Sequence, residues 1–290
     1  MVNCILIADS GSTKTDWILT IARNSILEVE TMGINPVRDS RDAIFDIIKN
    51  HLAPKIPKGY QVSKIYFYGA GCIEPYKKNV EEVLSGIFGP DAEIAVESDL
   101  LGAARALCGN KKGIACILGT GSNSCLYDGR VITCNTSPLG FILGDEGSGA
   151  FLGKTLVSNV LKKIFSQKLQ EQFLERFHLT PPIIINKVYR EPMPNRFLAS
   201  LVPFLAEHRE ETEIHDMIVW AFQEFFVRNV EAYGHPEIEI NCVGSIAFYF
   251  EKELKEAAAK EGLKLGKILQ KPAQELANFH RKTLFWGQKR

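Results

Sequence analysis

The chain carries no surplus of charge of either sign and no long apolar run. Its 290 residues include 34 Lys and Arg and 34 Asp and Glu, so the formal net charge is +0. Nucleic acids and anionic membranes attract proteins mainly through an excess of basic residues, and we therefore expect no nucleic acid and no membrane as partner. No apolar stretch approaches the length of a membrane-spanning helix, about 18 residues, and the first residues lack a signal-peptide pattern. These absences favour a cytoplasmic protein.

A cysteine framework is also missing. There are seven cysteines, an odd number, and no two of them form a Cys-x-x-Cys pair. Several lie in apolar segments of strand length, which is typical of buried free thiols in a reducing compartment. A structural zinc site or an iron–sulfur cluster within one chain is therefore not expected.

What the sequence does contain is a pair of loops rich in glycine and hydroxyl residues. Residues 9–16 (Asp-Ser-Gly-Ser-Thr-Lys-Thr-Asp) and 118–123 (Leu-Gly-Thr-Gly-Ser-Asn) each follow an apolar run and precede another strand-like segment. Glycine lets backbone N–H groups approach an anion, hydroxyls add donors, and Lys14 adds positive charge. Asp9 is placed to hold magnesium. One such loop is usually a turn, but two in the same context predict a duplicated fold that grips one ligand from both sides.

The first half of the chain alternates strands and helices, which predicts a mixed sheet covered by helices. After the opening hairpins, the expected elements are a helix capped by Asp39 or Ser40, a strand at 64–68, a helix starting at Pro75, a strand at 93–96 and a helix at 100–107.

Residues 110–113 form the best boundary, because the strand-loop-strand block repeats beyond them. We predict one domain over residues 1–112 and a second, with a helical insertion, over 113–271. The final helix, at about 272–290, could pack back on the first domain.

One tempting motif fails. Residues 148–155 nearly match a P-loop, but the first position is serine and no strand precedes it. We expect instead a helix beginning near Ser148, with Lys154 as a solvated helix residue.

The ordered motifs resemble those of the N-acetylglucosamine kinases and the BadF/BadG/BcrA/BcrD-type ATPases, within the sugar-kinase, heat-shock-70 and actin superfamily. The resemblance covers residue 2 to about 281. Its pieces are the two phosphate loops at 9–15 and 118–123, the segments Gly33–Pro36, Glu97–Asp99 and Gly144–Ser148, and the adenosine loop Cys242–Ser245. The chain departs from the family at Ser10 and Ser12, where glycine is common, and at Pro138-Leu139-Gly140, where eukaryotic amino-sugar kinases have Gly-Trp-Gly.

The resemblance implies an α/β fold of two ribonuclease-H-like (actin-like ATPase) domains, with mixed sheets flanked by helices and an active-site cleft between the domains. It implies ATP and Mg2+ as cofactors, with Asp9 organising the metal. The residues implied at ATP are Gly11, Ser12, Thr13, Lys14, Thr120, Gly121, Gly244 and Ser245. Those implied at the sugar are Asn35, Asp99, Ser122, Asn123, Gly140 and Asp145, with Asp99 as the general base on the C6 hydroxyl.

Several of these residues have an ordinary structural alternative. Asp99 precedes a helix, where aspartate is commonly an N-cap. Asn35 precedes proline, and the pair reads as a turn. Asp145, followed by Glu146 and Ser148, resembles the start signal of a helix.

The predicted function is ATP-dependent phosphorylation of an N-acetylated amino sugar, with N-acetylglucosamine favoured and its 6-phosphate as product. N-acetylmuramate or glucosamine is the alternative substrate, because small pocket changes can invert a preference. An activator-type ATPase that drives a redox partner is an alternative from another class, and a non-catalytic sugar sensor is a third. Similarity to the family also suggests a homodimer.

Overall fold

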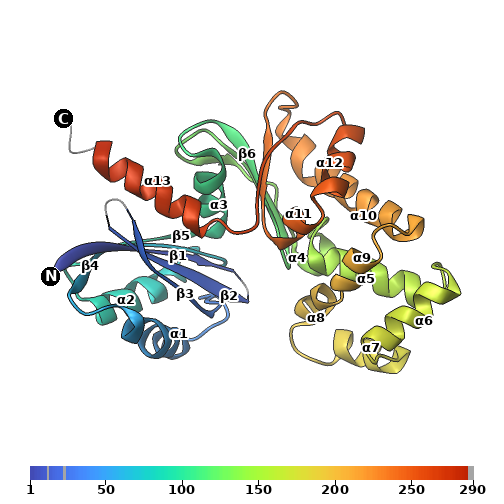
Figure 1. The fold of residues 1–290 in the computed structure, drawn as a ribbon, viewed down its shortest axis with the longest axis horizontal. Helices are drawn as coiled ribbons and strands as arrows, with labels where there is room; N and C mark the ends of the chain where they lie inside the picture. The colour runs from blue at the N-terminus through green and yellow to red at the C-terminus, as the bar shows by residue number, and fades with distance from the viewer. Residues whose placement is uncertain (12, 22–23, 287–290) are drawn as a thin grey trace. The chain divides into compact units, whose positions relative to one another are not determined.

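The computed structural model describes residues 1–11, 13–21 and 24–286, with side chains as far as residue 282. The chain divides into two compact units, both drawn in Figure 1. Unit 1 comprises residues 1–111, 129–131 and the segment from Lys271 onward, and unit 2 comprises residues 112–128 and 132–270. Over the described residues, no helix combines the length and the apolar character needed to span a membrane.

Unit 1 is built on a five-stranded mixed sheet in the order β3-β2-β1-β4-β5. Its strands are β1 (Val2–Ser10), β2 (Lys14–Thr20), β3 (Ser25–Met32), β4 (Tyr60–Gly69) and β5 (Glu93–Ser98). β1 pairs antiparallel with β2 and parallel with β4, and β4 pairs parallel with β5. Because parallel strands run in one direction, β1, β4 and β5 end at the same edge of the sheet.

Helices cover both faces of this sheet. Successive side chains of a strand point to opposite faces, so Leu6 packs with Ile44 and Val80, whereas its neighbour Ile7 packs with Ala106 and Leu276. The first face therefore carries α1 (Arg41–Ile47), the short η1 (Ile48–Leu52) and η2 (Ala53–Lys55), and α2 (Lys77–Phe88). The second carries α3 (Asp99–Cys108) and the C-terminal α13 (Ala273–Trp286), which lie side by side in Figure 1.

The starts of α1 and α2 were both predicted from the sequence. Ser40, one of the two predicted caps, is the N-cap of α1, and its hydroxyl accepts the Ala43 N–H at 3.2 Å. The start predicted at Pro75 was early, because α2 begins at Lys77.

Unit 2 repeats the sheet of unit 1. Its strand order is β10-β9-β6-β7-β8, and the strands are β6 (Gly113–Leu118), β7 (Ser122–Tyr127), β8 (Ile132–Cys134), β9 (Ile240–Val243) and β10 (Leu265–Leu269). β6 pairs antiparallel with β7 and parallel with β9, and β9 pairs parallel with β10. The pairing pattern of β1 to β5 thus recurs in β6 to β10, which confirms the predicted α/β fold of two ribonuclease-H-like domains.

The helical insertion of unit 2 lies between β8 and β9. Its helices are α4 (Gly140–Leu143), α5 (Gly149–Leu161), α6 (Gln167–Arg176), α7 (Pro181–Tyr189), α8 (Pro194–Ser200), α9 (Pro203–Glu207), α10 (Thr212–Phe225), η3 (Phe226–Val230) and η4 (Glu231–Tyr233). Between β9 and β10 lie α11 (Ser245–Tyr249) and α12 (Glu251–Lys260). Their apolar faces share one core with β6 and β9.

Candidate active site

The first glycine–hydroxyl loop closes the β1–β2 hairpin of unit 1. The Gly11 N–H donates to the Lys14 carbonyl at 3.0 Å, and the hydroxyls of Ser10 and Thr15 lie 2.6 Å apart. The Ile34 N–H also donates to Ser10 Oγ at 3.0 Å. This buried serine, at a position where the family often has glycine, therefore ties the loop to the segment that precedes Asn35. Ser12 lies outside the described residues.

Asp9 and Asp99 lie at the edge where the parallel strands of unit 1 end. Asp9 is opposite Tyr68 on β4, which is opposite Glu97 on β5, and Asp99 follows two residues later. Burial, reinforced by the carboxylates of Asp99 and Asp16, raises the pKa of Asp9 to about 7. Burial raises the pKa of Asp99 to about 6. Two neighbouring carboxyls with destabilised charged forms can bind a cation or exchange a proton.

Asp99 is not the N-cap of α3. Ser98 occupies the N-cap position of α3, and its hydroxyl accepts the Leu101 N–H at 3.3 Å. Asp99 is the first helical residue, and its Oδ1 accepts the Leu100 N–H at 2.9 Å. The helix start therefore orients the Asp99 carboxylate without needing it as the cap.

Asn35 begins the turn that the sequence suggested. Its side-chain oxygen accepts the Val37 N–H at 3.1 Å, and its own N–H donates to Asp39 Oδ2 at 2.7 Å. Gly71, after β4, packs against it so closely that a Cβ there would lie 2.2 Å from Asn35 Oδ1. The Asn35 side chain is thus held in one place beside the strand edge.

The second loop closes the β6–β7 hairpin of unit 2 and is held by the start of α5. The carbonyls of Gly119 and Thr120 accept the N–H groups of Gly149 and Ala150 at 2.8 and 3.0 Å. Ser148 is the N-cap of α5, as predicted, with its hydroxyl accepting the Phe151 N–H at 3.1 Å. The first N–H groups of a helix have no partner within it, so the loop carbonyls take them up.

Asp145 lies against this second loop. Its Oδ1 accepts the Ser122 N–H at 3.4 Å, and a Cβ on Gly121 would come within 3.0 Å of its Oδ2. Burial raises the pKa of Asp145 to about 6. The Ser122 hydroxyl is buried and has no hydrogen-bond partner among the described residues. Buried polar groups are nearly always paired in native proteins, so this unpaired hydroxyl beside a carboxylate is unusual.

The remaining predicted residues of unit 2 are Gly244, Ser245, Asn123 and Gly140, and Gly244 lies at the same strand edge. Gly244, after β9, has φ +125, and a Cβ there would lie 2.2 Å from the Leu118 carbonyl oxygen at the end of β6. Only glycine lets these backbones approach so closely. Ser245 follows it, exposed, as the first residue of α11. Asn123 Oδ1 accepts a hydrogen bond from Asn135 at 2.9 Å. Gly140 has a left-handed φ of +74 at the start of α4.

Lys14 and Thr13 lie at the start of β2. Thr13 is exposed, and its carbonyl accepts the Gly33 N–H at 3.0 Å. Lys14 Nζ pairs with Glu30 Oε2 on β3 at 3.0 Å. Sequence reasoning missed Glu30 and its second partner, Lys271. The alternation of charges along β2 and β3 could have indicated Glu30, but no local signal marks Lys271.

The expectation that Lys154 is solvated was wrong. This half-buried lysine donates to the carbonyl of Phe141, the second residue of α4, at 2.9 Å and lies over the Phe151 ring. It anchors α4, the helix that begins at Gly140, to α5.

The carboxylates of this site fit a magnesium ion that keeps most of its waters, but not one held by protein side chains alone. Among the described residues, no group of three His, Cys, Asp or Glu side chains is arranged to hold a metal ion. Mg2+, however, commonly keeps most of its waters and takes one or two carboxylates together with substrate phosphates. Asp9, a buried carboxyl beside the first loop whose charged form a bound cation would stabilise, is suited to that role.

Within unit 1, the structure brings Asp9, Gly11, Lys14, Asn35 and Asp99 to one sheet edge. Within unit 2, it gathers Thr120, Gly121, Ser122, Gly244 and Asp145 at the equivalent edge. A duplicated ribonuclease-H-like sheet with a glycine–hydroxyl hairpin in each copy defines the class of actin-like ATPase folds.

Comparison with solved structures identifies the family. A proposed N-acetylglucosamine kinase from Porphyromonas gingivalis is 44% identical, with 97% of this chain and 99% of that chain covered and a TM-score of 0.93. The chain therefore belongs to the N-acetylglucosamine kinase and BadF/BadG/BcrA/BcrD-type ATPase family.

Two more distant structures share the fold. A proposed N-acetylglucosamine kinase from Chromobacterium violaceum is 16% identical, with 96% of this chain and 99% of that one covered and a TM-score of 0.78. A ROK family glucokinase from Streptomyces griseus, solved with glucose and AMPPNP, is 13% identical, with 97% and 98% covered and a TM-score of 0.55. No protein-family model and no curated protein matches the chain.

Proposed function

We propose that the protein is an ATP-dependent kinase that phosphorylates an N-acetylated amino sugar, with N-acetylglucosamine as the favoured substrate and its 6-phosphate as the product. The observation that carries the proposal is the 44% identity, over nearly the whole of both chains, to a protein described as a proposed N-acetylglucosamine kinase. The clustering of the motif residues within each unit supports it.

In this proposal, Asp99 is the general base on the sugar hydroxyl. A pKa of about 6 leaves its carboxylate mostly ionised at neutral pH, yet closer to the pH of the reaction than an ordinary aspartate. Its orientation is set by the Leu100 N–H. Such a group orients the attacking oxygen and accepts its proton as the phosphoryl group transfers.

The phosphates would be bound by the two hairpin loops. Phosphoryl transfer needs mainly positioning and charge neutralisation, and bound Mg2+ supplies part of that charge. Asp9 would hold the ion, Lys14 would contact the terminal phosphates, and backbone N–H groups would supply further donors. The loop residues in these roles are Gly11, Ser12 and Thr13 in unit 1 and Thr120 and Gly121 in unit 2, with Gly244 and Ser245 at the nucleoside.

The sugar would be held by hydrogen bonds from both units. The orphaned Ser122 hydroxyl beside Asp145 supports this assignment most directly, because a sugar hydroxyl can satisfy both groups. Asn35, Asn123 and Gly140 complete the proposed set. Asn123 already accepts hydrogen bonds through its oxygen, which leaves its amide nitrogen facing a different direction.

ADP release tests the proposal. Purified protein would be given magnesium–ATP alone, then with N-acetylglucosamine, N-acetylmuramate, glucosamine or glucose. We expect strong stimulation by N-acetylglucosamine, with the 6-phosphate detected by mass spectrometry. Stimulation only by another amino sugar would correct the substrate. Hydrolysis that is indifferent to every sugar would favour a partner-driving ATPase instead.

The activator-type alternative requires cysteines that can reach a cluster shared by two copies of the chain. Five of the seven cysteines are buried in the cores of the units, Cys108 is half-buried and Cys134 is exposed. Buried thiols cannot ligate a cluster at a subunit surface without rearrangement, so this arrangement favours the kinase. A homodimer remains part of the proposal by family similarity alone.

A further inference from the structure

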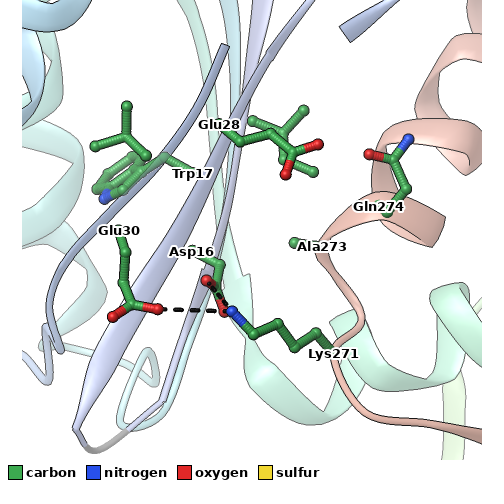
Figure 2. A pocket seen from close by; sticks show the side chains of 9 residues that line it. Asp16, Trp17, Glu28, Glu30, Lys271, Ala273 and Gln274 are labelled. Atoms are coloured by element: carbon green, nitrogen blue, oxygen red, sulfur yellow. Dashed lines mark hydrogen bonds and ion pairs between the residues drawn. The ribbon is translucent and has the colours of Figure 1, made fainter.

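Four charged side chains form a cluster beside the first phosphate loop, and we call Lys14, Asp16, Glu30 and Lys271 the charge cluster. Lys14 Nζ lies 3.0 Å from Glu30 Oε2 and 3.7 Å from Asp16 Oδ2. Lys271 Nζ lies 2.9 Å from Asp16 Oδ1 and 3.5 Å from the same Glu30 oxygen, as Figure 2 shows. Each ammonium group therefore touches both carboxylates.

The sheet register places two carboxylates opposite each other, and two cations are needed to balance their charge. Asp16 on β2 is directly opposite Glu30 on β3, and like charges in opposite positions repel. Lys14 lies two residues before Asp16, so its side chain is on the same face and reaches diagonally to Glu30. Its ammonium offsets half of the negative charge of this pair in the free protein.

The second cation comes from far along the chain and has a fixed position. Lys271 precedes α13, whose Ala273 and Leu276 are buried against Ile7 and Ile18 of the sheet. The packing of α13 thus brings the Lys271 backbone to β2. Its side chain is about half exposed, so replacing it should not disturb the core.

We propose that Lys271 is a positioning residue for Lys14: it neutralises Asp16 and Glu30 so that the Lys14 ammonium is released to contact a nucleotide phosphate. This inference rests on the proposed function, in which Lys14 binds the phosphates. With all four groups charged, the cluster is neutral. When Lys14 turns to a phosphate, the other three carry a net charge of −1; without Lys271, two bare carboxylates would remain and would draw Lys14 back.

The test is the dissociation constant of magnesium–ATP, measured by calorimetry. Exposed ion pairs are individually weak, so we expect Lys271→Met to raise Kd about 2- to 5-fold. Lys271→Arg, which keeps the charge, should bind as the parent does. Lys49→Met, at an exposed lysine of η1 in the same unit, is the matched control and should also leave Kd unchanged. Binding of N-acetylglucosamine alone should be equal in all of them.

Two double variants separate this role from simple repulsion of ATP or a structural defect. Glu30→Gln added to Lys271→Met should restore much of the affinity, because one competing carboxylate is gone. In a Lys14→Met background, Lys271→Met should have a clearly smaller effect than it has in the parent. A loss of the same size in that background would overturn the inference, since Lys271 would then act without Lys14.

The inference and the proposed function fail in different ways. If the unaltered protein binds magnesium–ATP and Lys271→Met binds it with the same Kd, the inference alone is overturned. If the unaltered protein binds no ATP, the proposed function is overturned and the inference falls with it.

Discussion

The β1–β2 loop of unit 1 and the β6–β7 loop of unit 2 occupy equivalent places in equivalent sheets, yet they carry different chemistry. The first is flanked by three residues with ionisable side chains, Asp9, Lys14 and Asp16. The second, from Gly119 to Asn123, contains no charged residue, and its carboxylate neighbour Asp145 comes from the segment before α5. The two loops are also held differently, by a serine hydroxyl in unit 1 and by helix N–H groups in unit 2.

This difference shows that the repeated sheet places residues at the same edge in both units, and that the residues found there set the chemistry of each edge. Parallel strands bring their ends to one edge in both units, so any residue following them is placed near the loop. Unit 1 has ionisable groups at that edge, which are suited to a metal, a phosphate and a proton. Unit 2 uses it for neutral donors and close backbone approach, which suit phosphate oxygens and sugar hydroxyls without adding charge.

The largest effect is expected from removing Asp99, the proposed general base, from unit 1. Asp99→Asn should lower kcat about 10²- to 10⁴-fold, because general base catalysis contributes about that much. The Kd of ATP should stay near the parental value, since the loop and Lys14 are untouched. Steady-state kinetics with N-acetylglucosamine would measure the loss, and Asp46→Asn, at an exposed aspartate of α1, is the matched control. Comparable turnover by Asp99→Asn and the parent would remove Asp99 as the base.

The next largest effect is expected in unit 2, where the backbone at Gly244 approaches the end of β6 closely. Gly244→Ala would place a Cβ 2.2 Å from the Leu118 carbonyl oxygen at a φ of +125. We expect the second loop to shift and the Kd of ATP to rise about tenfold or more, because small misplacements at a reacting site are costly. Gly262→Ala also has a positive φ, +67, but meets nothing within 4 Å, so it should cost some stability and leave Kd unchanged. Equal ATP binding by the two variants would contradict this account.

A smaller effect is expected on β7, where Ser122 and Ser124 should differ in their effects on sugar binding and on stability. Ser122→Ala removes a hydroxyl that has no partner among the described residues, so the protein should lose no thermal stability. The KM for the sugar should rise about 2- to 12-fold, which corresponds to the typical net free energy of one hydrogen bond. Ser124→Ala is the control, because that hydroxyl bonds the Asn229 carbonyl at 3.0 Å and the Tyr233 hydroxyl at 2.7 Å. It should lower Tm and affect KM little; the reverse pattern would argue against Ser122 as a sugar ligand.

Most of the fold could be predicted from local sequence patterns. Apolar runs and turn residues predicted the hairpins, and the repeated loop predicted the duplication. The sequence offered Asp99 as a cap of α3, whereas the N-cap is Ser98, because the backbone conformation at residue 98, with ψ 149, selects the serine.

Long-range contacts could not be read from the sequence. Lys271 meets Asp16 across 255 positions, through the packing of α13, which no local pattern encodes. Lys154 looked solvated because its acceptor, the Phe141 carbonyl, is 13 residues away in sequence and comes within reach only when α4 packs beside α5. Such partners become visible only when the sheet has brought distant segments together.

The smallest effect tests the cost of keeping a carboxylate in unit 1. The pKa of Asp99 is raised by burial from 3.8 to about 6, so the folded state binds its proton more tightly than the unfolded state. Stability therefore falls as pH rises through the window from about 4 to 6 and stays reduced above it. Asp99→Asn removes the charge but keeps an oxygen for the Leu100 N–H. Its Tm should match the parent near pH 4 and exceed it by about 2–5 °C at pH 8, after allowance for solvent screening. Calorimetric scans at the two pH values measure the difference, and a variant less stable than the parent at pH 8 would show that the carboxylate stabilises the fold instead of burdening it.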